Sequence, residues 1–283
     1  MRYKKFGLIL PALVVFGSLI IYPLFYSLKA SFYHWNQGIQ GSFVGFQNYI
    51  NLFKSLFFFA SLKNTGILVA VALLFEFIIG LILALLANRE LGKVRPVIRT
   101  LLIIPMLISP IAVGIIWRMI YNSQYGLFDW VLGIRGFSPT GNTTYAIFFV
   151  ALVDIWQWTP WVFIIILASL QTIPKEIEEA SLVDGANYFQ RLFYITLPSI
   201  SYSIIIVLTL RFMSLTKTLD KIYTLTYGGP GASTETIGFL IFRKAFEEFD
   251  IGFATAYSWV YTIIIGIIIT IYLKWLNRRF DVV

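Results

Sequence analysis

Two short stretches of otherwise apolar chain hold the residues best suited to chemistry. The first carries polar and indole side chains three and four residues apart: Asp154, Gln157, Trp158 and Trp161. The second repeats that spacing: Arg211, Ser214, Leu215 and Thr218. On a helix, each set shares one face. Polar groups bind carbohydrate hydroxyls and flat aromatic faces cover the apolar side of a sugar ring, so both stripes suit a pathway lined for sugars.

Three charged residues interrupt long apolar runs: Glu76, Asp154 and Arg211. Charges inside a membrane are costly and usually face a pathway or a partner group. The alternative is that they hold helices together, with Asp154 paired to Arg211. Glu76 is the weaker pathway candidate, because no second polar residue shares its face nearby. If Asp154 does not neutralise Arg211, the cation favours an anionic sugar or a glycerol phosphate over a neutral oligosaccharide.

The sequence offers little for catalysis or metal binding. It has one histidine, His34, and no cysteine, and no acid, base and nucleophile converge in a motif. The glycines of YGGPGAST, residues 227–234, indicate a turn, because no Gly-Lys-Ser/Thr ending follows them. We therefore expect no enzyme activity, no metal and no cofactor in this chain, and any ATP chemistry belongs to another chain.

The composition indicates an integral membrane protein. Of the 283 residues, 58% are hydrophobic and only 13% are charged, whereas ordinary soluble domains are about 25% charged. The net charge is +8, and the basic residues lie in short clusters beside apolar runs. Basic residues in such places orient membrane helices, so we expect membrane lipid, and no nucleic acid, as a partner.

Six apolar runs define the architecture. They cover residues 6–28, 65–88, 97–121, 145–170, 198–218 and 253–273. Each is about twice as long as the ~9–11 residues of a membrane β-strand, and helices satisfy their own backbone hydrogen bonds in lipid. We predict an all-α, polytopic membrane protein with six transmembrane helices, organised as a single transmembrane domain over residues 1–283.

Basic residues also predict the orientation. Twelve Lys and Arg residues lie on one predicted side of the membrane, at the two ends of the chain and in the connections 89–99 and 171–197. The longer connections on the other side hold eight. Cytoplasmic loops are enriched in Lys and Arg. We therefore expect a multi-pass protein of the cell (inner) membrane with both termini in the cytoplasm.

A polar segment at residues 173–198 separates the fourth and fifth runs. Pro174 suits the first turn of a helix over 175–183, whose acids lie near its positive end. Gly185 can adopt positive φ and end that helix; residues 187–194 suit a second short helix, and Pro198 then opens the fifth span. Acids mixed with small and apolar residues suit a docking surface for a cytoplasmic partner. The alternative is an amphipathic helix resting on lipid.

The segment resembles the EAA loop of the permease subunits of binding-protein-dependent ABC importers. That pattern is Glu-Ala-Ala, three residues, Gly, nine residues, then Ile-x-Leu-Pro. Here Glu179, Gly185 and Pro198 keep every spacing, and only Ser181 departs from it, in place of the second Ala. The stretches LPALVVFGSLIIYPLFYSLKASFYHW, FVGFQNYINLF and DKIYTLTYGGPGASTETI resemble the sugar branch of the family, of maltose, multiple-sugar and glycerol-phosphate type.

The resemblance implies a type I ABC importer permease fold and transport of a sugar or oligosaccharide into the cytoplasm. It also makes 173–198 a coupling segment that contacts an ATPase, through eight residues: Glu178, Glu179, Ala180, Ser181, Asp184, Gly185, Ala186 and Pro198. The implied partners are a second homologous permease subunit, two ATP-binding subunits that hold ATP and Mg, and an extracellular solute-binding protein.

The rival hypothesis is an ion-driven secondary transporter powered through Asp154 or Glu76. It leaves the coupling segment unexplained. It also predicts uptake by the chain alone under an ion gradient, whereas a permease subunit requires its ATPase.

Overall fold

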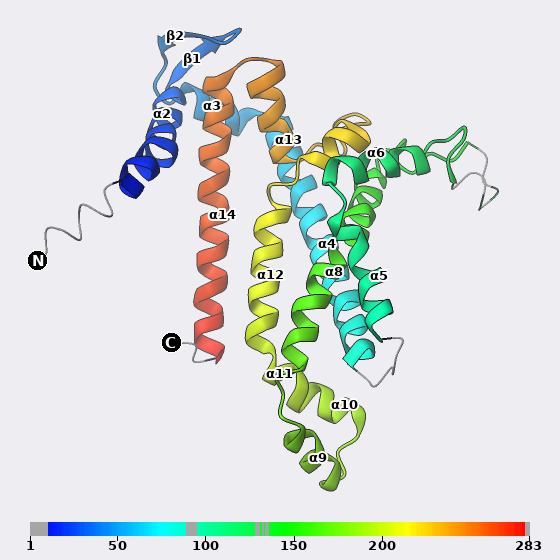
Figure 1. Ribbon diagram of the computed structural model, residues 1–283. Helices are drawn as coiled ribbons and strands as arrows, with labels where there is room; N and C mark the ends of the chain where they lie inside the picture. Colours follow the sequence, from blue (N-terminus) through cyan, green and yellow to red (C-terminus); the bar gives the residue numbers. More distant parts are fainter. Residues whose placement is uncertain (1–10, 89–94, 128–130, 132, 134–135, 281–283) are drawn as a thin grey trace, which may run out of the picture. The chain divides into compact units, whose positions relative to one another are not determined.

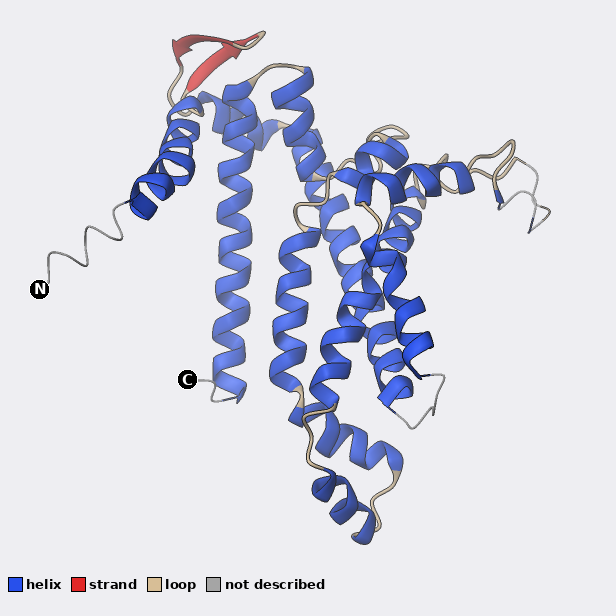
Figure 2. Ribbon diagram, viewed as in Figure 1, coloured by secondary structure: helices blue, strands red, loops and turns tan. Residues whose placement is uncertain are grey.

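The computed structural model describes residues 11–88, 95–127, 131, 133 and 136–280 (Figure 1). The contacts within the chain divide it into two compact units. The first unit combines Met1–Phe59 with Leu240–Val283, and the second is Ala60–Phe239. Helices dominate the described residues (Figure 2), which confirms the all-α class. The basic residues at positions 2–5, 89 and 93, on which the predicted orientation partly depends, lie outside the described residues.

Among the described residues, four helices are long and apolar enough to cross a membrane: Pro11–Ala30, Leu56–Asn88, Ala146–Leu170 and Ile251–Tyr272. Two bent pairs also qualify: Arg99–Leu107 with Pro110–Ile120, and Tyr188–Ser199 with Ser201–Leu215. If each bent pair is one span, the six predicted spans are obtained. The second span begins at Leu56 rather than at residue 65, so the predicted connection before it is shorter than expected.

The first unit contains two of the candidate membrane spans, a two-stranded hairpin and short helices. Its elements are η1 (Gly17–Ile21), α2 (Tyr22–Ala30), β1 (Tyr33–Asn36), β2 (Ile39–Phe43), α3 (Gln47–Lys54), η5 (Arg243–Glu247) and α14 (Ile251–Phe280). The two antiparallel strands pair Tyr33 with Phe43 and Asn36 with Ile39. Gln37 and Gly38 both have positive φ, 49° and 81°, as a two-residue hairpin turn of the right twist requires.

The remaining elements belong mainly to the second unit. They are α4 (Leu56–Asn88), α5 (Arg95–Leu107), α6 (Pro110–Ile120), α8 (Ala146–Leu170), α9 (Lys175–Val183), α10 (Tyr188–Arg191), η3 (Leu192–Thr196), α11 (Leu197–Ser199), α12 (Ser201–Leu215), η4 (Ile222–Thr226) and α13 (Ile237–Phe242). Helix α8 is the most buried of the four single-helix spans in the described part of the chain. It packs against α5, α6 and α12.

Small residues let α4 approach α8 closely. A Cβ on Gly80 would lie 2.9 Å from a methyl carbon of Val162, so a larger residue would force the helices apart. Ala84 and Ala87 join Val162 and Phe163 in the buried core of this unit. Because α8 is central to this core, the side chains on its inner faces are held in fixed positions.

The third span is strongly bent, and the prediction of one helix over 97–121 is wrong. Helices α5 and α6 meet at 97°. Pro110 has no N–H to continue the helix and restricts the preceding residue to extended backbone. Ser109 accordingly has ψ of 135°.

The fifth span bends by 67° at Ile200, between α11 and α12. Pro198 is therefore the second residue of the short α11, and the prediction that it opens the fifth span is wrong. The second short helix of the coupling segment also does not stop at residue 194, because α10, η3 and α11 follow one another without a break.

Candidate functional site

Four charged side chains meet inside the second unit. The Arg211 guanidinium donates from Nε to Glu76 Oε2 and from Nη2 to Glu76 Oε1, both at 2.6 Å. Its Nη2 also donates to Asp154 Oδ2 at 2.6 Å. The Lys221 ammonium donates to Asp154 Oδ1. We call Glu76, Asp154, Arg211 and Lys221 the ion cluster.

The ion cluster joins four separate parts of the unit. Glu76 lies on α4, Asp154 on α8 and Arg211 on α12, while Lys221 is the N-cap of η4. Each of the four is at most 4% exposed. Two carboxylates compensate two cations, so the cluster is neutral when all four are ionised. Burying an unpaired charge is expensive, so each member depends on its partners.

The indole of Trp158 covers the two cations. The Arg211 guanidinium carbon lies 5.2 Å from the centre of the ring, and the Lys221 ammonium nitrogen lies 5.9 Å from it. These are distances at which a cation is attracted to an aromatic face. The cluster therefore fixes the position of Trp158.

A pocket of about 550 Å³ lies between α8 and α12. It has seven lining residues: Trp158, Trp161, Leu210, Arg211, Met213, Ser214 and Lys217. We call it the polar pocket. Two indoles, a hydroxyl and cationic groups in one hollow match the mixture that binds a sugar.

The structure brings four of the predicted pathway residues into the polar pocket, namely Trp158, Trp161, Arg211 and Ser214. The other four lie elsewhere. Asp154 binds the two cations of the cluster. Leu215 packs in a buried group with Val69 and Ala72.

Gln157 and Thr218 also serve the framework. The Gln157 side-chain Nε2 donates to the carbonyl of Ile108 at 2.8 Å, at the bend between α5 and α6. Thr218 accepts a hydrogen bond from the Thr236 hydroxyl at its backbone carbonyl, at 3.2 Å. Gln157 lies on α8 as predicted, but Thr218 lies beyond Leu215, where α12 ends, so the predicted stripe does not continue to Thr218 on that helix. Sequence spacing also did not distinguish the side of each helix that faces the pocket.

Sequence analysis missed several members of the site. Lys217, Leu210 and Met213 line the polar pocket, and Lys221 completes the ion cluster. The partner of Glu76 is Arg211 on α12, so a search for polar neighbours on the helix face of Glu76 itself did not find it. Sequence spacing gave no signal for Lys221, because its partner Asp154 is 67 positions away in the sequence.

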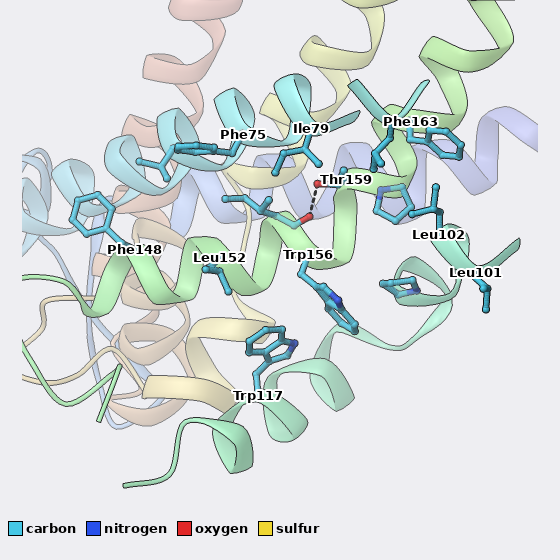
Figure 3. A pocket seen from close by; sticks show the side chains of 15 residues that line it. Phe75, Ile79, Leu101, Leu102, Trp117, Phe148, Leu152, Trp156, Thr159 and Phe163 are labelled. Atoms are coloured by element: carbon cyan, nitrogen blue, oxygen red, sulfur yellow. Dashed lines mark hydrogen bonds between the residues drawn. The ribbon is translucent and has the colours of Figure 1, made fainter. Parts of the chain in front are cut away.

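A second, apolar pocket of about 740 Å³ lies between α4, α5, α6 and α8 (Figure 3). Figure 3 shows Trp117 of α6 and Trp156 of α8 side by side among its lining residues, with ring centres 5.6 Å apart. The hydroxyl of Thr159 donates to the Ile155 carbonyl at 2.6 Å, so its proton is already used within the helix. With so few hydrogen-bonding groups, this apolar pocket does not suit a sugar.

The coupling segment has the predicted helix–glycine–helix form. Helix α9 spans the predicted Lys175–Val183, and Gly185 has φ of +75°. The Gly185 N–H donates to the Leu182 carbonyl at 3.1 Å and the Ala186 N–H to that of Ser181 at 3.0 Å, which closes the helix end in a Schellman motif.

The second half of the segment begins with a capping box. The Asn187 side chain accepts from the Gln190 N–H at 2.9 Å, while the Gln190 side chain accepts from the Asn187 N–H at 2.8 Å. Both caps are local, so the turn between the helices is specified by a few adjacent residues.

The coupling segment exposes apolar side chains together with its acids. Val183 is 88% exposed, and Leu182 and Phe189 are also exposed. Glu178, Glu179, Ala180 and Asp184 are exposed as well, whereas Ser181 is buried and donates to the Glu178 carbonyl at 2.6 Å. This mixture is typical of an interaction surface.

Glu178 and Glu179 differ in surroundings. Glu178 and Ser181 line a hollow of about 330 Å³ with Arg191, against the ends of α4 and α8 at Asn88 and Leu170. Glu179 is not among the described residues that line this hollow. The segment thus borders the ends of the spans at this hollow, whereas Glu179 and Asp184 are exposed and do not line it.

The described helices, the polar pocket and the exposed helical segment define a polytopic membrane protein with the architecture of a transporter subunit. The chain belongs to the family of binding-protein-dependent transport system inner membrane components, which matches residues 76–282. The expectation of an ABC importer permease is therefore confirmed, and the family places it in the membrane as a transporter component rather than as a nucleotide-binding enzyme.

Relatives cover almost the whole chain. The trehalose/maltose transport system permease protein MalF of Thermococcus litoralis is 36% identical over 96% of this chain and 94% of its own length. The sulfoquinovosyl glycerol transport system permease protein SmoG of Agrobacterium fabrum is 31% identical over 96% of this chain and 90% of its own.

The fold also matches a solved structure. A chain of the bacterial alginate ABC transporter, in complex with alginate pentasaccharide-bound periplasmic protein, superposes with a TM-score of 0.82 at 24% identity. The match covers 98% of this chain and 94% of that one. The predicted type I importer permease fold is confirmed by this likeness.

Proposed function

We propose that this chain passes a neutral sugar or oligosaccharide through the polar pocket into the cytoplasm. The observation that carries the proposal is the lining of the pocket, where Trp158, Trp161 and Ser214 lie with Arg211. The charge of Arg211 is compensated by the carboxylates of Glu76 and Asp154. Indole faces stack on the apolar side of sugar rings, while the hydroxyl and the guanidinium edge bind sugar hydroxyls. The names of the relatives and of the structural neighbour support a saccharide as the substrate class. Trehalose and maltose are neutral, whereas sulfoquinovosyl glycerol and alginate are anionic.

The charges of the pocket favour the neutral substrate. Arg211 is held by Glu76 through two hydrogen bonds and by Asp154 through a third. An anion approaching Arg211 would meet two carboxylates behind it, so the attraction is largely cancelled.

One observation favours an anionic substrate. Lys217 lines the polar pocket, is exposed, and forms no ion pair within the described residues. An ammonium group so placed can bind a carboxylate, sulfonate or phosphate of a ligand. An acidic sugar or a glycerol phosphate is therefore the second candidate.

Coupling to ATP is assigned to residues 173–198. In this proposal Glu179 contacts a partner ATPase, Gly185 sets the bend between the helices, and the hollow beside Glu178 passes movement to the ends of α4 and α8. Two ATP-binding subunits hold ATP and Mg, a second permease completes the pathway, and an extracellular solute-binding protein delivers the sugar. Both termini lie in the cytoplasm, and the two units act as one permease domain.

The decisive experiment identifies the carbohydrate that copurifies with the binding protein of the complete complex. Neutral and acidic oligosaccharides of equal length are then compared in proteoliposomes, using wild type and Lys217→Gln. We expect uptake of the neutral sugar that is unchanged in Lys217→Gln. Uptake of the acidic sugar alone, lost in Lys217→Gln, would establish the anionic alternative.

The same vesicles separate the proposal from an ion-driven transporter. We expect no uptake without the ATP-binding subunits, even under a proton or sodium gradient. Uptake by the chain alone under such a gradient would refute the coupling assignment.

A further inference from the structure

Helix α3, with its N-cap Phe46, has three distinct faces. Successive residues turn by about 100° around a helix, so residues three and four apart share a face. One face is apolar and exposed: Phe46, Ile50 and Phe53. The next is polar and exposed: Gln47, Asn51 and Lys54. The third is buried: Asn48 and Leu52.

The buried face fixes α3 to the end of α2. The Asn48 side-chain Nδ2 donates to the carbonyls of Ser31 and Tyr33, at 2.8 Å and 3.0 Å. The Tyr49 hydroxyl lies 2.7 Å from the Ser31 hydroxyl. Because Ser31 is the C-cap of α2, these bonds hold α3 at the level where that span ends.

The same helix packs against the beginning of α14. Phe58, four residues beyond α3, contacts Tyr257 in the second turn of α14, with ring centres 5.4 Å apart. The ends of membrane spans mark the boundary between hydrocarbon and headgroups. Helix α3 is thus fixed beside two spans at one membrane boundary.

We propose that α3 lies in the membrane interface and inserts Phe46, Ile50 and Phe53 among the lipid headgroups and upper acyl chains. Each face then has its own surroundings, namely lipid for the apolar face, water for the polar face and protein for the buried one. Interfacial helices of this kind insert by about 5–10 Å, and aromatic residues are enriched at that depth. Helix α2, to whose end α3 is bonded, also exposes apolar side chains, among them Phe25 and Tyr26.

The proposal does not depend on the transported substrate or on the coupling segment. Helix α3 also precedes residues 76–282, over which the family matches. It assigns to this chain a second kind of membrane contact, parallel to the surface, in addition to its spans.

The absence of cysteine from the sequence permits a clean test. Phe53→Cys and the control Asn51→Cys each receive an environment-sensitive fluorophore in the complete transporter complex, whose other subunits are made cysteine-free, reconstituted in vesicles. Quenching is measured with lipids brominated near the top of the acyl chain and with aqueous iodide. We expect bromolipid quenching about twofold or more stronger at Phe53→Cys than at Asn51→Cys, and the opposite order with iodide.

Two other results would overturn the proposal. Iodide quenching at both positions without bromolipid quenching would place the apolar face in water, and its loss on adding solute-binding protein would identify a docking surface for that protein. A Phe53→Cys label shielded from both quenchers would mean that another subunit covers the face. Ile50→Cys gives the same readout if Phe53→Cys prevents assembly.

Discussion

The ion cluster and the coupling segment use charge in opposite ways. The cluster hides four charges at the meeting point of α4, α8, α12 and η4, and each charge is satisfied by a partner far away in the sequence. The coupling segment leaves Glu178, Glu179 and Asp184 exposed next to exposed apolar side chains.

The contrast separates a charge that maintains the fold from a charge that is available to a partner. A buried charge that loses its partner is left uncompensated, so its removal affects stability. An exposed acid is solvated by water, so its removal has little effect on stability and acts only through what it binds. Substitutions in the two regions should therefore give different patterns of stability and transport.

The largest loss of stability is expected for Asp154→Asn. Asp154 accepts hydrogen bonds from both Arg211 and Lys221, and the variant leaves Lys221 without a carboxylate partner. Breaking a buried pair in this way costs about 3–5 kcal/mol. The midpoint of thermal unfolding of the purified complex measures the effect, with the exposed Asp220→Asn as the control. A stability of Asp154→Asn equal to that of the control would contradict the structural role of the cluster.

A smaller, more specific effect is expected when Glu76→Gln and Arg211→Gln are combined. Each single variant leaves one net charge in the cluster, whereas the double variant restores neutrality. We expect the double variant to lose less stability than the sum of the singles, by about 0.5–3 kcal/mol, the usual range for residues in contact. Additive losses in the same unfolding assay would mean that the two side chains act independently.

The next largest effect is expected for substitutions of Gly185 that strain the backbone of the turn. A β-branched residue at φ of +75° costs about 1–2 kcal/mol relative to glycine, while Asn tolerates that conformation. No atom lies within 4 Å of an added Cβ, so the cost is conformational rather than a clash. We expect Gly185→Val to reduce transport per ATP hydrolysed and Gly185→Asn to remain close to wild type. Equal activity of the two variants would exclude a need for the turn.

The smallest effect on stability is expected for Glu179→Gln, since exposed substitutions usually change it by no more than about 0.5 kcal/mol. Transport should nevertheless fall, because Glu179 is exposed, does not line the hollow beside Glu178 and is assigned to the ATPase contact. Glu178→Gln is the matched comparison, and its transport should fall less. If a loss of stability in Glu179→Gln accounts for its lost transport, the distinction between charges that maintain the fold and charges that bind a partner would fail.

Structural features that depend on residues adjacent in the sequence were predicted correctly. The apolar runs follow from composition, and α9, the Gly185 turn and the start of the next helix follow from local caps. The ion cluster could not be predicted in full, because its hydrogen bonds join residues 57 to 135 positions apart. The 97° bend of the third span was not predicted, because it depends on the packing of α5 and α6 against α8 as well as on Pro110.

The central claim is that the polar pocket carries the sugar, and two tryptophans of α8 test it most directly. Trp158 lines the polar pocket, whereas Trp156, two residues away, lines the apolar pocket. Sugar moved per ATP hydrolysed is measured in proteoliposomes for Trp158→Ala and Trp156→Ala. Our account predicts a loss of about tenfold in Trp158→Ala, equivalent to ~1.4 kcal/mol of lost stacking, with Trp156→Ala close to wild type. An unchanged ratio in Trp158→Ala, or an equal loss in both variants, would contradict it.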